Sequence, residues 1–111
     1  MKSTLVYLAV PYSHQDQSVR ERRFQAANVK AAKLMAEGRH VFSPISHSHV
    51  IALAHSLPVT WKFWRDQDMA VLRHCCALVV YQLDGWDRSV GVRAEIEAAT
   101  SLGIPIEYHK E

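Results

Sequence analysis

The sequence predicts one small doubly wound α/β domain, in which helices cover both faces of a sheet of four to five mainly parallel strands. Four short apolar stretches alternate along the chain with segments whose apolar residues recur at helical spacing. Such alternation is typical of parallel sheets, because a helical crossover returns the chain to the start of the next strand. With 111 residues the chain has the size of a single domain, so residues 1–111 are expected to fold as one unit.

The first strand and helix are expected near the N-terminus. Leu5–Val10 is a continuous apolar run, as in a strand that is buried on both faces of a sheet. Ser18, with Glu21 three residues later, has the spacing of a capping box, which predicts that a helix begins there. Gly38 follows the last apolar residue of the helical pattern and is expected to end this helix.

The middle of the chain has weaker signals. His40–Ser43 is expected to form a second short strand, which a proline ends. Residues 44–60 have the least regular pattern, and only Val50–Ala54 is expected to form one or two helical turns. An amphipathic pattern over residues 60–74 predicts a further helix with Thr60 as its N-cap.

The C-terminal part has the clearest alternation of elements. Cys76–Tyr81 is expected to be the third strand, and the turn Asp84–Asp87 follows it. Ser89–Leu102 has helical periodicity and ends at Gly103. Ile104–Tyr108 is expected to be a fourth strand at an edge of the sheet, because only an edge tolerates its proline.

Three polar loops follow the predicted strands, at residues 11–17, 43–49 and 83–91. Ligands of open α/β sheets bind outside the carboxyl ends of the strands, so these loops are expected to meet at one crevice. The last loop passes through a glycine into a helix, and free backbone N–H groups at such a place can hold an anion. Glu95 lies one turn inside that helix. The pattern indicates a phosphorylated or hydroxyl-rich small molecule that faces a carboxylate.

Composition and charge exclude several other classes of function. A net charge of +2 is too small to indicate a nucleic-acid polymer or a membrane surface as the partner. The apolar runs are far shorter than the roughly 20 residues of a membrane span, and the N-terminal run has the wrong flanks for a signal peptide. Cys75 and Cys76 are adjacent and therefore poorly placed to bridge each other. Reduced thiols and a cytoplasmic location are expected.

Three sequence pieces carry a resemblance to a known family. Together they resemble the nucleoside 2-deoxyribosyltransferase superfamily over essentially the whole chain. The closest branches are its small 2′-deoxynucleoside 5′-monophosphate N-glycosidase-like members and uncharacterised bacterial and phage members. The resemblance implies a Rossmann- or flavodoxin-like sheet, an enzyme without metal or cofactor, and a homodimer or larger homo-oligomer. The pieces are the opening strand Val6–Tyr12, the segment Gln67-Asp68-Met69 with Leu72, and Ser89-x-Gly91-Val92-x-x-Glu95 with Gly103-Ile104-Pro105.

The resemblance also implies catalytic roles for three residues. Glu95 would be the nucleophile, Tyr7 would orient it by a hydrogen bond, and Asp68 would contact the leaving base and position a proton. Each residue also has an ordinary structural explanation. Glu95 could be a solvated helix residue, Tyr7 a core side chain, and Asp68 a surface partner of a neighbouring arginine.

Substrate contacts are expected from the loops at the crevice. Members of the superfamily that act on free nucleosides usually carry Asp at the position of Ser89, whereas the monophosphate N-glycosidases carry Ser. A hydroxyl group suits a phosphate, which an Asp would repel. Gly91 allows the backbone to approach the ligand closely. Trp61, Trp64 and Trp86 are expected to be core or subunit contacts, and Trp86 is the best candidate among them to stack on a base. The remaining substrate-binding candidates are Pro11, Ser13, His14, Arg20, Ser46 and His47.

The sequence thus favours an N-glycosidase or deoxyribosyltransferase-like enzyme that cleaves the N-glycosidic bond of a nucleoside 5′-monophosphate or nucleoside. The alternative is a non-catalytic nucleotide-binding module of the same fold. A third hypothesis is a glycosidase that cleaves dinucleotides, but this activity needs a larger pocket than so short a chain can build. The two histidines of His47-Ser48-His49 are compatible with a metal site, but nothing fixes the remaining ligands.

Overall fold

The computed structural model describes residues 3–111 and confirms the α/β fold class. Within these residues four parallel strands form one sheet in the order β2-β1-β3-β4. The strands are β1 (Leu5–Ala9), β2 (His40–Phe42), β3 (Ala77–Gln82) and β4 (Ile106–Lys110). The helices are α1 (Gln17–Ala36), α2 (Pro44–His55), α3 (Trp61–Leu72) and α4 (Val90–Leu102), with a short 3₁₀ helix η1 (Trp86–Arg88) before α4.

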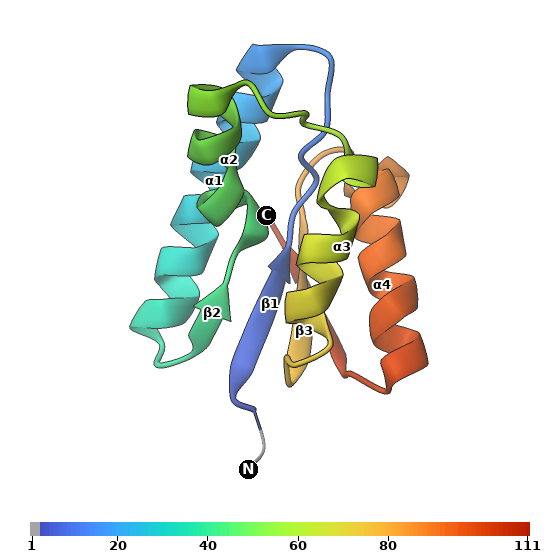
Figure 1. Ribbon diagram of the computed structural model, residues 1–111. Coiled ribbons are helices and arrows are strands. Elements are labelled where there is room, and N and C mark those ends of the chain that lie inside the picture. The colour runs from blue at the N-terminus through green and yellow to red at the C-terminus, as the bar shows by residue number, and fades with distance from the viewer. Residues whose placement is uncertain (1–2) are drawn as a thin grey trace.

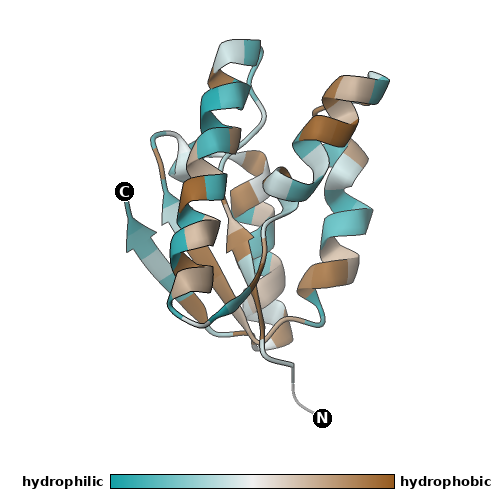
Figure 2. Cartoon of the chain, turned by 90° about the vertical axis from the view of Figure 1, so that its left-hand side faces the viewer, coloured by the Kyte–Doolittle hydropathy of each residue, from teal (hydrophilic) through white to brown (hydrophobic). Residues whose placement is uncertain are grey.

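The helices form two layers, with α1 and α2 on one face of the sheet and α3 and α4 on the other (Figure 1). Side chains of β1 alternate between the two resulting cores, as the pleat of a strand requires. Val6 and Leu8 pack in the core under α1 and α2, whereas Tyr7 and Ala9 pack in the core under α3 and α4. In the hydropathy view the middle of the sheet is hydrophobic, whereas the edge strand β4 is largely hydrophilic and the helices show hydrophilic residues on the outside (Figure 2).

The sheet has one topological switch point. The chain crosses from β1 to β2 on one side of β1, and from β3 to β4 on the far side of β3. The crevice that such a reversal opens therefore lies beyond the carboxyl ends of β1 and β3. Residues 56–60, which connect α2 to α3, pass across this end of the molecule from one helical layer to the other (Figure 1).

The predicted start of α1 was wrong, whereas its end is confirmed. Asp16, and not Ser18, is the N-cap, because its Oδ1 accepts hydrogen bonds from the backbone N of Ser18 at 2.9 Å and from Oγ of Ser18 at 2.8 Å. A carboxylate two residues upstream thus takes the capping position. Gly38 follows the C-cap Glu37 with φ of +91°, a conformation that favours glycine.

The prediction for residues 44–60 was also wrong in part, because a full helix, Pro44–His55, replaces the expected one or two turns. Pro44 occupies its first turn, where the missing N–H costs nothing. Ser48 and His49 face inward, so the buried side of α2 does not have an apolar pattern in the sequence. Thr60 is the N-cap position of α3, as expected.

The strands differ from the predicted ones by one or two residues at their ends, which is the ordinary uncertainty of element boundaries. Val10, Ser43 and Cys76 lie just outside β1, β2 and β3. The fourth strand begins at Ile106 instead of Ile104 and lies at the edge of the sheet as predicted. The carbonyl of Pro105 still accepts a hydrogen bond from the backbone N of Leu78 at 2.9 Å.

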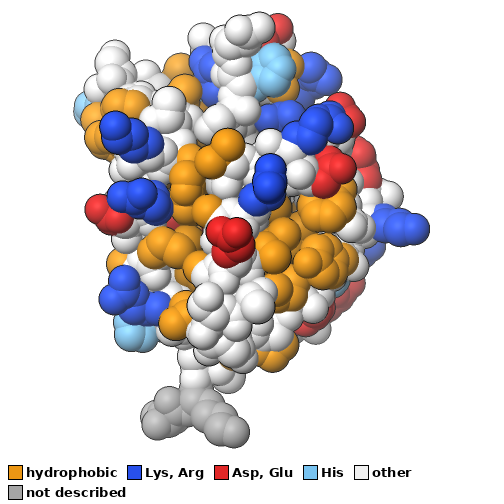
Figure 3. Space-filling model, turned by 90° about the vertical axis from the view of Figure 1, so that its right-hand side faces the viewer, with side chains coloured by type: hydrophobic (Ala, Val, Ile, Leu, Met, Phe, Trp, Pro, Cys, Tyr) orange, Lys and Arg blue, Asp and Glu red, His pale blue; other side chains and the backbone are white. Residues whose placement is uncertain are grey.

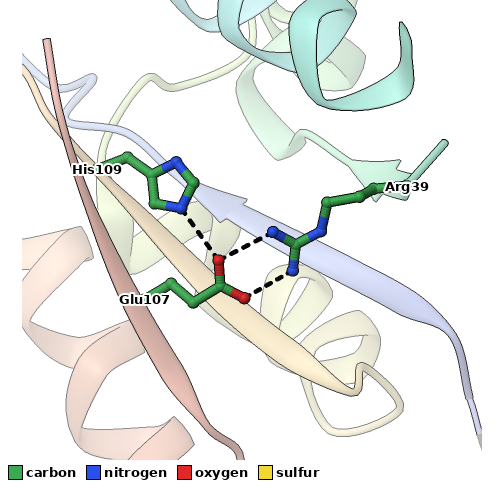
Figure 4. A network of polar contacts seen from close by, with 3 residues as sticks. All are labelled: Arg39, Glu107 and His109. Carbon is green, nitrogen blue, oxygen red and sulfur yellow. Dashed lines mark hydrogen bonds and ion pairs between the residues drawn. The ribbon is translucent and has the colours of Figure 1, made fainter. Parts of the chain in front are cut away.

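A charged network stabilises the face of the sheet at β4 (Figure 4). Arg39, in the turn before β2, donates two hydrogen bonds to the carboxylate of Glu107 on β4, at 2.9 and 2.7 Å. The imidazole Nε2 of His109 lies 3.0 Å from Oε1 of the same carboxylate. The guanidinium and the imidazole lower the pKa of Glu107 to about 2.

The surface carries several exposed apolar side chains. On the side that α3 and α4 form, hydrophobic and charged side chains are mixed (Figure 3). Large exposed hydrophobic residues include Val50 and Leu53 on α2 and Phe63 on α3. The homo-oligomer expected from the sequence resemblance stays a prediction. No helix in residues 3–111 is long and apolar enough to cross a membrane.

Candidate active site

A cavity opens at the switch point, beyond the ends of β1 and β3. Four parts of the chain supply its walls: the loop after β1, α2, the α2–α3 connection with α3, and the N-terminal turns of α4. The predicted meeting of the three loops therefore has a physical counterpart. The lining residues are Val10, Tyr12, Ser13, Pro44, Ile45, Ser48, His49, Ala52, Val59, Thr60, Trp61, Trp64, Asp68, Ser89, Gly91 and Glu95.

Glu95 and Tyr7 meet at the floor of this cavity. Glu95 lies on the buried side of α4, three residues after Val92 and four before Ala99, and is 4% exposed. Tyr7 points to the same layer from the middle of β1 and is fully buried. The Tyr7 hydroxyl donates a hydrogen bond to Oε2 of Glu95. The fold therefore holds the carboxylate in one orientation from two rigid elements.

Burial dominates the protonation of this pair. It raises the pKa of Glu95 to about 8, although the hydrogen bond from Tyr7 opposes the shift and the charge of Asp68 adds a smaller increase. Burial and the neighbouring Glu95 carboxylate raise the pKa of Tyr7 far above its ordinary value. Tyr7 therefore remains a hydrogen-bond donor at every relevant pH.

Asp68 reaches the cavity from α3, one turn before the buried Leu72. It is 7% exposed, and its Oδ1 has no hydrogen-bond partner within residues 3–111. A buried carboxyl oxygen normally has a partner, so this atom is available to a ligand. Burial raises the pKa of Asp68 to about 7, so a large fraction of it carries a proton near neutral pH.

The N-terminus of α4 forms another wall. Ser89 is the N-cap, and its Oγ accepts a hydrogen bond from the backbone N of Val92 at 3.2 Å. Gly91 lies against Trp61, and a Cβ on Gly91 would come within 3.3 Å of its ring. A larger residue here would press on the ring and narrow the cavity. Ser89 and Gly91 both line the cavity, where the backbone N–H groups of α4 begin.

A second, more polar groove adjoins the cavity at the start of α4. The two hollows share Ser13, Thr60, Trp61, Ser89 and Gly91. Cationic side chains line the groove together with one carboxylate, Asp84. Basic side chains beside a helix N-terminus are a favourable place for an anion. The cationic residues are Arg23, Lys62 and Arg88, with His14 beside them.

The opposite wall of the cavity, at α2, contains a hydrogen-bonded chain of three side chains. Oη of Tyr12 lies 2.6 Å from Nδ1 of His49, and Nε2 of His49 lies 2.7 Å from Oε2 of Glu21. His49 is buried, and its ring stacks on Phe24 with 4.3 Å between the ring centroids. Tyr12 and His49 line the cavity, whereas Glu21 is exposed at the outer end of the chain.

The structure places the predicted catalytic residues Glu95, Tyr7 and Asp68 together. Of the predicted substrate-binding residues, Ser13, Ser89 and Gly91 line both hollows and His14 lines only the basic groove. The others lie elsewhere. Pro11 is fully buried, Arg20 donates a hydrogen bond to the carbonyl of His14, Ser46 pairs with Ser43, and His47 packs against Phe42.

Sequence reasoning missed the tryptophans of the cavity and the tyrosine–histidine wall. Trp61 and Trp64 line the cavity, whereas Trp86 packs edge-on against Tyr108 and does not. Trp86 thus packs against the core, as expected for the tryptophans, and its role as a stacking residue stays untested. The helical spacing of Trp61 and Trp64 next to Asp68 was the signal that could have found them. Within residues 3–111, no three His, Cys, Asp or Glu side chains cluster as metal ligands would.

Comparisons with known proteins give a family and a fold. The sequence model of a family described as a domain of unknown function, DUF1937, matches residues 4–111. No curated protein matches the chain. A solved structure of a 2-deoxyribosyltransferase from the psychrotolerant bacterium Bacillus psychrosaccharolyticus is similar, with a TM-score of 0.66 and 20% sequence identity. The match covers 96% of this chain and 72% of the other, and at this identity it shows a common fold.

Proposed function

The chain belongs to the DUF1937 family, and we propose that it cleaves the N-glycosidic bond of a nucleoside 5′-monophosphate or nucleoside. Glu95 is the nucleophile of this N-glycosidase or deoxyribosyltransferase-like reaction. The observation that carries the proposal is that the buried carboxyl groups of Glu95 and Asp68 line one cavity, with the Tyr7 hydroxyl hydrogen-bonded to Glu95. Carboxylates with raised pKa in a cleft are typical of acid–base and nucleophilic sites.

The first step uses the two carboxyl groups in different protonation states. An oxygen of ionised Glu95 forms a bond to the anomeric carbon while the bond from that carbon to the base nitrogen breaks. The electron pair of the broken bond goes to the base. Protonated Asp68 gives its proton to the departing base, and Tyr7 keeps Glu95 oriented during the attack.

The second step releases the sugar from Glu95. Water attacks the anomeric carbon, gives its proton to the Asp68 carboxylate, and restores the carboxylate of Glu95. A nucleobase in place of water would give a deoxyribosyl transfer by the same path. The fold likeness to a 2-deoxyribosyltransferase supports this class of chemistry and leaves the acceptor open.

The basic groove supports a 5′-phosphate on the substrate. It begins at Ser89 and Gly91, which also line the cavity of Glu95, so one ligand can extend through both hollows. A phosphate there would meet the N-terminus of α4 and the side chains of Arg23 and Lys62. The groove thus favours a monophosphate over a free nucleoside.

The proposal is tested by base release from a panel of ribo- and deoxyribonucleosides and their 5′-monophosphates. Free base is followed by chromatography for the wild type and for Glu95→Gln. We expect release by the wild type and a loss of at least about 1,000-fold in Glu95→Gln, because the amide is not a nucleophile.

Glu97→Gln is the matched control, since Glu97 is on the same helix but exposed. It should retain the wild-type rate. Ligand-dependent thermal stabilisation without release of base by the wild type would overturn the enzyme proposal and favour the nucleotide-binding module.

A further inference from the structure

The hydrogen-bonded chain of Glu21, His49 and Tyr12 has no role in the steps described above. It runs inward from the exposed carboxylate of Glu21 on α1, through the buried imidazole of His49 on α2, to the Tyr12 hydroxyl. Its inner end forms part of the cavity wall. A surface carboxylate is thereby connected to the hydroxyl of a residue that lines the cavity.

The partners of His49 determine which atom carries each proton. An ionised carboxylate only accepts hydrogen bonds, so Nε2 of His49 donates to Glu21. In the neutral imidazole Nδ1 then has a free lone pair and accepts a hydrogen bond from the Tyr12 hydroxyl. Burial raises the pKa of Tyr12, so its hydroxyl keeps that proton. The single O–H of Tyr12 is thus used within the protein, and only lone pairs of its oxygen remain for a ligand.

Under the proposed function, Tyr12 is a candidate contact of the nucleobase, because it lines the same cavity as Glu95 and Asp68. With the sugar over Glu95 and a phosphate at the N-terminus of α4, the unfilled part of the cavity lies between Asp68 and the α2 wall. Ile45 and Trp64 supply apolar surface to this part. A flat, largely apolar ring with polar edges suits it.

We propose that the Glu21–His49–Tyr12 chain fixes the Tyr12 oxygen as a hydrogen-bond acceptor and thereby selects nucleobases that present an amino group. Tyr12 is the specificity-determining residue, and His49 is the positioning residue that acts through it. The proposal rests on the proposed function for the identity of the occupant, a nucleobase. A base with a carbonyl in the same place would put two acceptors against each other, which a built polar site rejects.

Matched pairs of ligands test this proposal. The pairs dCMP with dUMP and dAMP with dIMP each exchange one amino group for one carbonyl, and the neighbouring ring nitrogen changes from an acceptor to an N–H donor. Dissociation constants are measured by calorimetry in the Glu95→Gln background, and base release in the active enzyme. We expect the amino member of one pair or both to bind and react better by about tenfold or more.

Three tyrosine and histidine variants separate the roles. In Tyr12→Phe the ratio of the affinities of the amino and carbonyl members should fall to about one, because no acceptor is left. His49→Phe keeps an aromatic ring stacked on Phe24. The Tyr12 O–H is then free to donate, so the carbonyl members should bind more tightly and the preference for the amino members should shrink or reverse. Tyr108→Phe is the control, since Tyr108 lies outside the cavity and its variant should keep the wild-type preference.

The outcomes distinguish this inference from the proposed function. Equal affinity for both members of each pair in the wild type, or an unchanged preference in Tyr12→Phe, would overturn the inference even if base is released. An amino preference that Tyr12→Phe abolishes, in a wild type that releases no base, would support the inference and sink the glycosidase. If His49→Phe does not fold, as judged by thermal melting, the result with Tyr12→Phe decides.

Discussion

Two glutamates of this chain have opposite electrostatic surroundings. Glu107 faces the guanidinium of Arg39 and the ring of His109, and these partners lower its pKa to about 2. Glu95 is more deeply buried and has a tyrosine hydroxyl as its partner, and burial raises its pKa to about 8. Within residues 3–111 no cationic side chain forms an ion pair with Glu95.

The difference separates a stabilising network from a reactive one. A charge that cations neutralise contributes to stability and has little reason to react. A charge that is removed from water without a cation costs stability, and proteins retain such groups mainly where function needs them. The second carboxyl near Glu95, Asp68, also lacks a partner for one oxygen. Burial without compensation is therefore what we expect at the site of the proposed chemistry.

After Glu95→Gln, the largest effect on activity is expected from Asp68→Asn. The amide cannot give a proton to the leaving base, so base release should fall by roughly 100-fold to 10,000-fold. If the proposed mechanism is right, wild-type activity should rise as Glu95 ionises and fall as Asp68 loses its proton, with pKa values raised by burial to about 8 and about 7. Because the nucleophile has the higher pKa, we expect kcat/KM plotted against pH to be a narrow bell-shaped curve between these two values. The apparent pKa values of the acid and alkaline sides of this curve belong to the pair and not to either residue alone.

The measurement is kcat/KM for base release across pH 5 to 10, with Asp68→Asn beside the wild type. The variant should lose the alkaline limb and keep the acid limb. A wild-type profile that stays flat through this range would contradict the assignment of both groups.

The next effect is on stability, and it concerns Glu95 itself. Its pKa rises from 4.5 in the unfolded chain to about 8 in the fold, so the native state binds the proton more tightly. Stability therefore falls as pH rises from 4.5 to 8. Glu95→Gln removes this titration and should raise the free energy of unfolding on the order of 2–3 kcal/mol at pH 8.5, after the weaker hydrogen bond to Tyr7 is discounted.

Urea unfolding at several pH values tests this effect, with the exposed Glu97→Gln as control. The gain should shrink as pH falls towards 4.5, where wild-type Glu95 is protonated in both states. A variant that is less stable than the wild type at pH 8.5 would show that the hydrogen bond to Tyr7 outweighs the cost of burial.

The fold, and the positions of Glu95 and Tyr7 in the candidate site, could be predicted from the sequence. Parallel strands that are buried on both faces are continuous apolar runs, so Leu5–Ala9 and Ala77–Gln82 are visible without a structure. The strand–turn–helix pattern around Gly91 placed Glu95 at the crevice. The placement of Tyr7 beside Glu95 came from the family resemblance, since 88 residues separate the two in sequence.

The α2 wall was not predictable in the same way. Its buried side carries Ser48 and His49, which pair with groups from α1 and from the loop after β1. Long-range hydrogen bonds leave no periodic trace in the sequence, so the helix looked like an irregular loop. Ser46 and His47 were selected by residue type, and the register of α2 turned them away from the cavity.

The smallest effect is expected at Glu107, with the opposite sign to that at Glu95. Its pKa falls from 4.5 to about 2 in the fold, so the ion pair stabilises the protein above pH 4.5 and this contribution is lost as pH falls towards 2. The side chain is 39% exposed, and solvent screening reduces the value of the pair to about 1 kcal/mol. Glu107→Gln should therefore lose about that much at pH 7, lose less at pH 3, and release base at the wild-type rate. A large loss of activity in this variant would mean that the two regions are coupled, and the contrast between a stabilising and a reactive glutamate would not hold.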